Sequence, residues 1–484
     1  MSLATALADE FRSAIGAHGV LCQPEALRTY ECDALTNMRA LPLAVLLPES
    51  VEHVQAILRI CHRERLPFVA RGAGTGLSGG ALPVPHGVVI SLARMTRILE
   101  VDYANARVVV EPGVINLTVT AQVSGRQFYY APDPSSQSVC SIGGNVAENS
   151  GGAHCLKYGF TTTHVVGLEV VLPDGRLVHL GGKALDAPGY DLAGVFVGSE
   201  GTLGIATKVI LRIVKRPETV QTLLAAFPTV EQSSAAVSQI IADGILASAM
   251  EIMDNLSIQA AEAAVHAGYP SCGGLLLVEL DGPGAEVDEQ RAAVHRICEA
   301  NGAGEIRLAR SDAERALVWK GRKAAFAAMG RIASNYIVQD GVIPRTALPD
   351  VMRDIGRLSE AAGLRVANVF HAGDGNLHPM VLYDRDVPGQ QHEAEQLSFR
   401  ILELCVEKGG SITGEHGVGE EKKMMMGRMF AEPDLDTMQR VRCAFDPLGL
   451  ANPTKVFPRP RLCGDTPGEY VPHALERTGQ ADRF

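Results

Sequence analysis

A glycine-rich segment at residues 71–80 is the feature that most constrains how this chain can fold. It reads RGAGTGLSGG, and Gly74, Gly76 and Gly79 fit the G-x-G-x-x-G spacing of dinucleotide-binding loops. In a Rossmann domain such a loop opens a helix whose N-terminus holds the pyrophosphate. Here the chain continues ALPVPHGVVISL, with prolines before a β-rich run, so a nicotinamide-dependent Rossmann dehydrogenase is disfavoured. The loop can still turn tightly and present backbone N–H groups to an anion.

Two further segments have the same conformational freedom. Residues 131–159 read APDPSSQSVCSIGGNVAENSGGAHCLKYG, and residues 197–205 read VGSEGTLGI. The run before the second of these contains an Asp174-Gly175 dipeptide between strand-like stretches, which predicts a hairpin. Upstream, the apolar spacing of residues 51–64 predicts a helix, followed by a short strand. Several separate segments that are free to turn tightly around a ligand indicate that one extended ligand contacts all of them.

The bulk properties favour an ordinary soluble protein of two large domains with terminal extensions, because 484 residues exceed one comfortable core. The net charge of -11 argues against a nucleic-acid partner. No apolar run reaches the ~18 to 20 residues that cross a bilayer, and the start of the chain does not look like a secretory signal, so a cytoplasmic protein is expected. The ten cysteines form no C-x-x-C pair, which predicts no iron–sulfur cluster on this chain.

Histidines and a glutamate concentrate in two segments of the C-terminal half. Residues 366–383, VANVFHAGDGNLHPMVLY, predict a hairpin that brings His371 and His378 to one mouth, and the segment GGSITGEHGVGEEK places Glu415 beside His416. Two imidazoles and a carboxylate form a ligand set suited to Zn²⁺ or a similar divalent ion. The alternative is that these histidines are surface or core residues. The H-E-x-x-H pattern of zinc proteases is absent.

The run WKGRKAAFAAMGR at residues 319–331 predicts a helix with Lys320, Arg322 and Lys323 near its start. Read without further information, this cluster is a solvated basic face.

The three glycine-rich segments resemble the FAD-binding domain of the vanillyl-alcohol oxidase (PCMH-type) flavoprotein superfamily. From about Tyr30 to Pro458, the chain is similar to the family of glycolate oxidase FAD subunits and FAD-dependent D-2-hydroxy acid dehydrogenases. The resemblance implies an α+β protein with a PCMH-type FAD-binding domain and a C-terminal α+β cap. We expect an N-terminal helical extension over 1–37, the FAD-binding domain over 38–217, the cap with the metal site over 218–458, and a tail over 459–484.

The resemblance also implies which residues contact FAD. The first segment would wrap the pyrophosphate, the second would run along the flavin and ribityl chain, and the third would close over the adenine side. Because no histidine lies within residues 71–80, FAD is expected to bind non-covalently. Asn452 is expected to approach the flavin, although its segment could equally be a loop that ties down the C-terminus. The residues expected to bind FAD are Arg71, Gly72, Ala73, Gly74, Thr75, Gly76, Ser78, Gly79, Pro132, Asp133, Ser138, Gly143, Gly144, Asn145, Asn149, Gly152, Glu200, Ile205 and Asn452.

For the reaction site, the resemblance of HAGDGNLHP and GEHG to the motifs of the 2-hydroxy acid dehydrogenases implies roles for four groups. His371, His378 and Glu415, rather than Asp374, are the expected ligands of Zn²⁺ or Mn²⁺. His416 is the expected general base. Arg322 matches the arginine that pairs with the substrate carboxylate, and Arg345 is a weaker candidate for that task.

The expected reaction is the FAD-dependent oxidation of a small 2-hydroxy acid, glycolate to glyoxylate, with a D-lactate dehydrogenase as the alternative. A non-catalytic, electron-transferring FAD subunit is the alternative from another class. Relatives that act on 2-hydroxyglutarate carry a lysine where this chain has Val338, two places before Asp340, which weakens the case for a second substrate carboxylate. Expected partners are an iron–sulfur subunit and a second FAD-domain subunit, with a quinone downstream, so the protein would lie peripherally at the inner membrane face.

Overall fold

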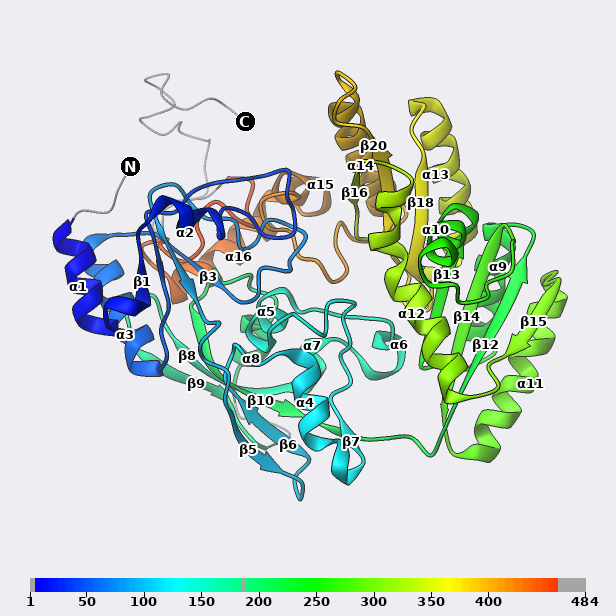
Figure 1. The fold of residues 1–484 in the computed structure, drawn as a ribbon, viewed down its shortest axis with the longest axis horizontal. Helices are drawn as coiled ribbons and strands as arrows, with labels where there is room; N and C mark the ends of the chain where they lie inside the picture. Colours follow the sequence, from blue (N-terminus) through cyan, green and yellow to red (C-terminus); the bar gives the residue numbers. More distant parts are fainter. Residues whose placement is uncertain (1–4, 185–188, 460–484) are drawn as a thin grey trace.

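The computed structural model describes residues 5–184 and 189–459, so the first four residues of the expected N-terminal extension and nearly all of the expected tail lie outside the described residues. An N-terminal part built on two sheets lies beside a C-terminal part built on one large sheet (Figure 1). The orange and red end of the chain, with α15 (Met426–Met429) and α16 (Glu432–Phe445), returns to the N-terminal part. The predicted α+β class is confirmed.

The first sheet has four strands, and its central strands are continuous buried runs. In spatial order its strands are β1 (Val20–Leu21), β2 (Ala44–Leu46), β4 (Val88–Ser91) and β3 (Phe68–Arg71). The last three are parallel, so both of their faces are covered and apolar side chains fill both. Helices α1 (Thr5–Ile15), α2 (Pro24–Arg28) and α3 (Val51–Glu64) belong to this layer. The predicted helix over 51–64 is confirmed, with Ser50 capping its start.

The chain does not form a helix directly after the glycine-rich segment. Between β3 and β4 the described backbone consists of turns and bends, and β4 follows. The segment is therefore not the opening of a Rossmann unit, as the prolines predicted. The parallel β-bridge between Phe68 and Ala451 adds the returning C-terminal segment beside β3.

The second sheet has five antiparallel strands and contains the predicted hairpin. Its spatial order is β5 (Ile98–Asp102), β6 (Arg107–Val110), β10 (Ile205–Arg212), β8 (Val165–Val171) and β9 (Leu177–Gly181). Strands β8 and β9 pair around a turn in which Gly175 has φ +84°, as the Asp-Gly dipeptide predicted. A short pair, β7 (Phe128–Tyr129) and β11 (Val214–Lys215), adjoins this sheet. The helices here are α4 (Asn116–Val123), α5 (Ile142–Glu148), α6 (Cys155–Tyr158), α7 (Thr161–His164) and α8 (Leu192–Phe196).

The C-terminal part is a nine-stranded sheet with helices on both faces. Its strands are β12 (Thr219–Phe227), β13 (Ala249–Asp254), β14 (Gly274–Gly282), β15 (Glu305–Leu308), β16 (Asn335–Val338), β17 (Gly341–Val342), β18 (Val366–His371), β19 (Asn376–Leu377) and β20 (Pro379–Tyr383). Along the longer strands, side chains alternate between two cores, as Leu223 and Leu224 do on β12. One core takes α9 (Val230–Ala242), α11 (Gly284–Ala300), α13 (Leu348–Ala362) and α14 (Gln390–Glu407), and the other takes α10 (Asn255–Val265) and α12 (Asp312–Ala328).

Charged groups join the two parts near β14. Lys157 and Tyr158 of α6 contact Asp281, with the Tyr158 hydroxyl 2.7 Å from its carboxylate. His154, just before α6, contacts Glu279 at 3.0 Å. Among the described residues, none of the helices combines the length and the apolar composition needed to cross a bilayer.

Candidate active site

A cavity of about 630 Å³ runs between the two parts of the molecule. One end is lined by the glycine-rich loop after β3 and by the start of α5, and the other by residues of the cap, including His378, Glu415 and His416. A volume in the range of about 300 to 1,000 Å³ is typical of cofactor sites. The cavity therefore connects the predicted FAD cradle with the predicted reaction site.

Eleven of the nineteen residues predicted to bind FAD line this cavity. They are Arg71, Gly72, Ala73, Gly74, Thr75, Gly76, Gly143, Gly144, Asn145, Glu200 and Ile205. The other eight are not in the lining: Ser78, Gly79, Pro132, Asp133, Ser138, Asn149, Gly152 and Asn452.

Of these eight residues, Asn452 and Ser78 connect the cradle to segments that are distant in sequence. The Asn452 amide donates hydrogen bonds to the carbonyl oxygens of Gly80, at 2.9 Å, and of Glu200, at 2.7 Å. The Ser78 carbonyl accepts hydrogen bonds from the backbone of Glu420 and Glu421. These contacts tie the returning C-terminal segment and the cap loop to the cradle.

Glycine is required where the loop approaches α5. A Cβ atom at Gly72 would clash with the Ser141 hydroxyl, and Gly74 has φ +73°. Ser141 caps α5 by accepting a hydrogen bond from the Gly144 N–H. The cradle is therefore backbone packed on a helix start, where N–H groups favour an anion.

The three predicted metal ligands lie together at the cap end of the cavity. The Nε2 atoms of His371 and His378 are 3.3 and 3.2 Å from the same oxygen of Glu415, Oε1. The predicted hairpin is confirmed, because His371 ends β18 and pairs with Asn376 of β19. Asp374 is not part of this group; it caps the turn by accepting from the Asn376 N–H at 3.2 Å.

The Nδ1 atoms of His371 and His378, on the side of each ring away from Glu415, lie close to hydrogen-bond acceptors. Nδ1 of His371 lies 2.7 Å from Glu251 Oε1, and Nδ1 of His378 lies 3.4 Å from the Gln339 carbonyl. If each Nδ1 carries the proton, both Nε2 lone pairs point at the Glu415 carboxylate, which is unfavourable unless a cation lies among them. Glu415 Oε2 is also buried without a hydrogen-bond partner among the described residues. The donor set therefore fits a divalent ion.

Arg322 contacts Glu251, the carboxylate that also contacts His371. Its guanidinium lies 2.5 Å from Glu251 Oε2, both side chains are buried, and Arg322 does not line the cavity. Its neighbour Lys323 does line it, with Nζ 3.4 Å from Asp133. Arg345 is also outside the lining and donates to the Gly373 carbonyl at 3.2 Å.

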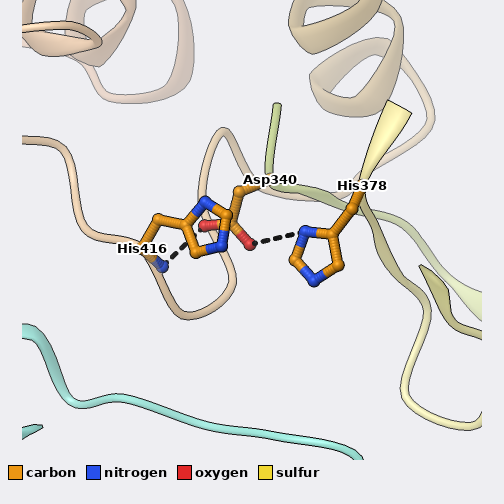
Figure 2. Close-up of side chains that lie close together, drawn as sticks. All are labelled: Asp340, His378 and His416. Atoms are coloured by element: carbon orange, nitrogen blue, oxygen red, sulfur yellow. Dashed lines mark hydrogen bonds and ion pairs between the residues drawn. The ribbon is translucent and has the colours of Figure 1, made fainter. Parts of the chain in front are cut away.

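Asp340 organises the loop that carries Glu415 and His416. Its Oδ2 accepts hydrogen bonds from the N–H groups of Gly414, Glu415 and His416 at 2.9, 3.1 and 2.8 Å, and from the Thr413 hydroxyl at 2.6 Å. Figure 2 shows the His416 backbone nitrogen and the His378 ring turned toward this carboxylate. Asp340, His378 and His416 form a second group of metal-ligand type. Because its Oδ2 is already saturated, Asp340 is better suited to holding the loop than to binding an ion.

The electrostatics of the site follow from this burial. Burial raises the pKa of Glu415, but its contacts with His371 and His378 outweigh that effect and hold the pKa well below its usual range. Burial lowers the pKa of His371, but the carboxylate of Glu251 outweighs it and raises that pKa well above its usual value. The pKa of His416 falls to about 4, chiefly through burial. The site thus favours positive charge among its carboxylates and a neutral imidazole at His416.

Sequence reasoning missed several residues of this site. Glu251 and Lys422 are fully buried beside it, and Glu148 lines the cavity. Glu251 sits in the apolar strand AMEIMD, where a lone acid among buried positions was the available signal.

A glycine cradle that continues into a His/His/Glu site, on two sheets plus a capping sheet, defines a flavin-dependent oxidoreductase. The chain belongs to the FAD-linked oxidases, since residues 42–181 match the "FAD binding domain" family and residues 216–456 match "FAD linked oxidases, C-terminal domain". The family resemblance seen in the sequence is thereby confirmed.

Relatives cover nearly the whole chain. Glycolate oxidase subunit GlcD of Escherichia coli K12 is 50% identical over 466 residues, which cover 96% of this chain and 93% of that protein. Glycolate oxidase subunit GlcD of Bacillus subtilis is 38% identical over 430 residues, covering 88% and 92%. D-lactate dehydrogenase of Archaeoglobus fulgidus is 32% identical over 441 residues, covering 89% and 95%.

Solved structures share the fold. 4-Ethylphenol oxidase from Gulosibacter chungangensis superposes with a TM-score of 0.78 at 20% identity, covering 93% of this chain and 96% of that one. p-Cresol methylhydroxylase gives a TM-score of 0.78 at 18% identity, with the same coverage. The predicted PCMH-type architecture is therefore confirmed.

Proposed function

We propose that this chain oxidises a small 2-hydroxy acid, glycolate to glyoxylate, with FAD as the electron acceptor. One observation carries the proposal: the cavity that begins at the glycine cradle ends at His378, Glu415 and His416. The 50% identity to the E. coli glycolate oxidase subunit favours glycolate among such acids.

FAD would occupy the glycine-lined end of the cavity without a covalent bond. No histidine lies in residues 71–80, and Cys140, which lines the cavity, has a pKa raised chiefly by burial, so its reactive thiolate is disfavoured. In this proposal the FAD-binding domain extends over residues 38–217 and the cap over 218–458.

The metal site would be His371, His378 and Glu415, with Zn²⁺ or Mn²⁺ as the ion. When bound, the ion would polarise the substrate hydroxyl and the flavin would accept the C2 hydride. Glu251 holds His371 by its Nδ1, and Asp340 holds the loop of Glu415, so this chain's own residues orient the ligands.

His416 would take the hydroxyl proton. Its ring is stacked on His378 with centroids 4.9 Å apart, and it lines the cavity, so it lies beside the metal ligands and reaches the substrate space. Lys323 and Arg385 are cations in the cavity lining that an incoming carboxylate would meet. The role of carboxylate partner predicted for Arg322 requires it to leave Glu251.

A D-lactate dehydrogenase is the second candidate, favoured by the similarity to the A. fulgidus enzyme over 89% of the chain. A non-catalytic electron-transfer subunit would have no use for the three converging ligands. Electrons would leave through an iron–sulfur partner subunit, with a second FAD-domain subunit in the assembly and a quinone downstream. The protein would then be cytoplasmic and peripheral to the membrane through these partners.

The test is anaerobic bleaching of the flavin absorption band by glycolate, D-lactate, L-lactate and D-2-hydroxyglutarate. We expect fast bleaching by glycolate or D-lactate in the wild type. In His378→Ala the bleaching should be lost while the FAD content stays normal, and His392→Ala, at an exposed histidine of α14, should behave as the wild type. Elemental analysis should show one divalent ion per chain, which is lost in His378→Ala.

The two candidate substrates are ranked by their bleaching rates. Absence of bleaching by every 2-hydroxy acid, in a protein loaded with FAD and metal, would instead favour the electron-transfer subunit. Bleaching that survives both His378→Ala and metal removal would contradict the assigned ligands.

A further inference from the structure

Glu148 is an acidic residue of the cavity wall that the reaction outlined above does not use. It is the last residue of α5 and lines the cavity together with Gly143 and Gly144 of the same helix. The residue as a whole is half-buried because it faces the cavity. Its Oε2 atom, however, is shielded from solvent and has no hydrogen-bond partner among the described residues.

The surrounding backbone is shaped to admit this side chain. A Cβ atom at Gly80 would lie 2.6 Å from Glu148 Oε1, and one at Gly417 would clash with Oε2. The carboxyl group thus lies between the glycine-rich loop and the loop that follows His416. Leaving a buried carboxyl oxygen without a partner is unfavourable, so such a group in a ligand cavity points to a partner on the ligand.

The neighbouring Glu200 shows what a satisfied carboxylate looks like here. Its two oxygens accept the N–H groups of Val418 and Gly419 at 2.7 and 2.6 Å. Burial raises the pKa of Glu200, and these two bonds oppose that rise. Negative charge on both Glu200 and the adjacent Glu148 is unfavourable. Burial and the charge of Glu200 together raise the pKa of Glu148 well above its usual value. The protonated form, which has an O–H group to donate, is therefore favoured at Glu148.

We propose that Glu148 contacts the cofactor directly, donating a hydrogen bond from its carboxyl group to bound FAD and so favouring the reduced flavin. The inference rests on the proposed placement of FAD in this cavity. Reduced flavin carries more negative charge than oxidised flavin, so a donor beside it raises the reduction potential, whereas an ionised carboxylate would lower it.

The experiment compares Glu148→Ala, Glu148→Gln and the control Glu421→Ala in the full-length protein. Glu421 is a matched control because it is also half-buried and has one oxygen without a partner among the described residues, but it does not line the cavity. The measurements are FAD affinity by titration of the apo-protein, the two-electron reduction potential, and the thermal midpoint of the apo-protein.

In Glu148→Ala we expect about tenfold weaker FAD binding to the oxidised apo-protein. We also expect a potential lower by about 30 mV, which corresponds to a further tenfold loss for the reduced form. The apo-protein should keep or gain thermal stability, because an unsatisfied group is removed. Glu148→Gln, which still donates, should stay near the wild type, as should Glu421→Ala.

Unchanged affinity and potential in Glu148→Ala, or a potential that rises, would overturn the inference. If Glu148→Ala fails to fold, infrared difference spectra of wild type and Glu148→Gln decide instead. A protonated-carboxyl band that shifts on flavin reduction in the wild type and is missing in the variant supports the contact, and the absence of such a band refutes it. Gly74→Val tests the placement itself: normal FAD affinity in that cradle variant would refute the placement of FAD rather than the role of Glu148 alone.

Discussion

His154 bridges the two parts of the molecule, and its replacement tests how they are held together. Its Nδ1 lies 3.0 Å from Asp133 in the N-terminal part, and its Nε2 lies 3.0 Å from Glu279 on β14 of the cap. Burial lowers the pKa of His154, but the two carboxylates outweigh it and raise the pKa to about 10. The imidazolium is therefore a cation held between two acids at neutral pH.

The expected cost of His154→Gln follows from that pKa. A rise from 6.5 to about 10, at about 1.4 kcal/mol per unit, sets an upper bound of about 5 kcal/mol. The side chain is 24% exposed, so solvent screens part of this energy, and glutamine still donates a hydrogen bond. We expect the variant to lose about 2 to 3 kcal/mol of unfolding free energy.

The pH dependence provides the sharper check. Because the pKa is raised in the folded state, the stabilisation is complete below pH 6.5 and is lost as the pH rises toward about 10. Trp319 is the sole tryptophan, and its ring centroid lies 5.6 Å from that of His154, so its fluorescence reports this contact during urea unfolding. If the difference in unfolding free energy between wild type and His154→Gln stays constant or grows with pH, the reasoning is refuted. The control His179→Gln, at an exposed histidine, should have the unfolding free energy of the wild type.

Three further variants probe the loop that carries Glu415 and His416 and the contacts around it. Asp340→Asn replaces an acceptor of four hydrogen bonds. It should slow flavin reduction about 10- to 100-fold in stopped-flow experiments, with the FAD content unchanged. Reduction at the wild-type rate would contradict the positioning role of Asp340. Gly417→Ala, at φ +84° against Glu148, should lower the thermal midpoint clearly more than Gly427→Ala, whose Cβ meets open space; equal midpoints would argue against the close approach. Asn452→Ala removes two buried hydrogen bonds and should cost about 2 kcal/mol in urea unfolding; no loss would mean that its anchoring contacts are dispensable.

Local patterns were enough to predict the elements that carry the site. The helix over 51–64 follows from its apolar spacing, and the hairpin around His371 and His378 follows from the turn sequence between two apolar runs. The proline-rich continuation after Gly80 was sufficient to exclude a Rossmann unit. In each case the information lies within about twenty residues of sequence.

The residues that hold the site residues in place could not be predicted, because they come from segments that are distant in the sequence. Glu251 meets His371 across 120 positions of sequence, and it pairs with Arg322, whose guanidinium was expected to face substrate. Lys422 stands in the run GEEKK, which is typical of a solvated face, yet it is fully buried 3.6 Å from Asp340. Only tertiary packing distinguishes a buried ion pair from a surface charge run.

The loop that carries His416 is fixed from both sides of the cavity. Asp340 of the cap accepts the N–H groups of residues 414–416, and Glu200 of the FAD-binding part accepts those of Val418 and Gly419. One short loop therefore ties the two parts together, and separating them would break charge-assisted hydrogen bonds on both sides of His416. Because separating the two parts would disrupt the loop that carries Glu415 and His416, we expect substrate to enter through the existing cavity, whose lining includes Lys323 and Arg385, without domain opening.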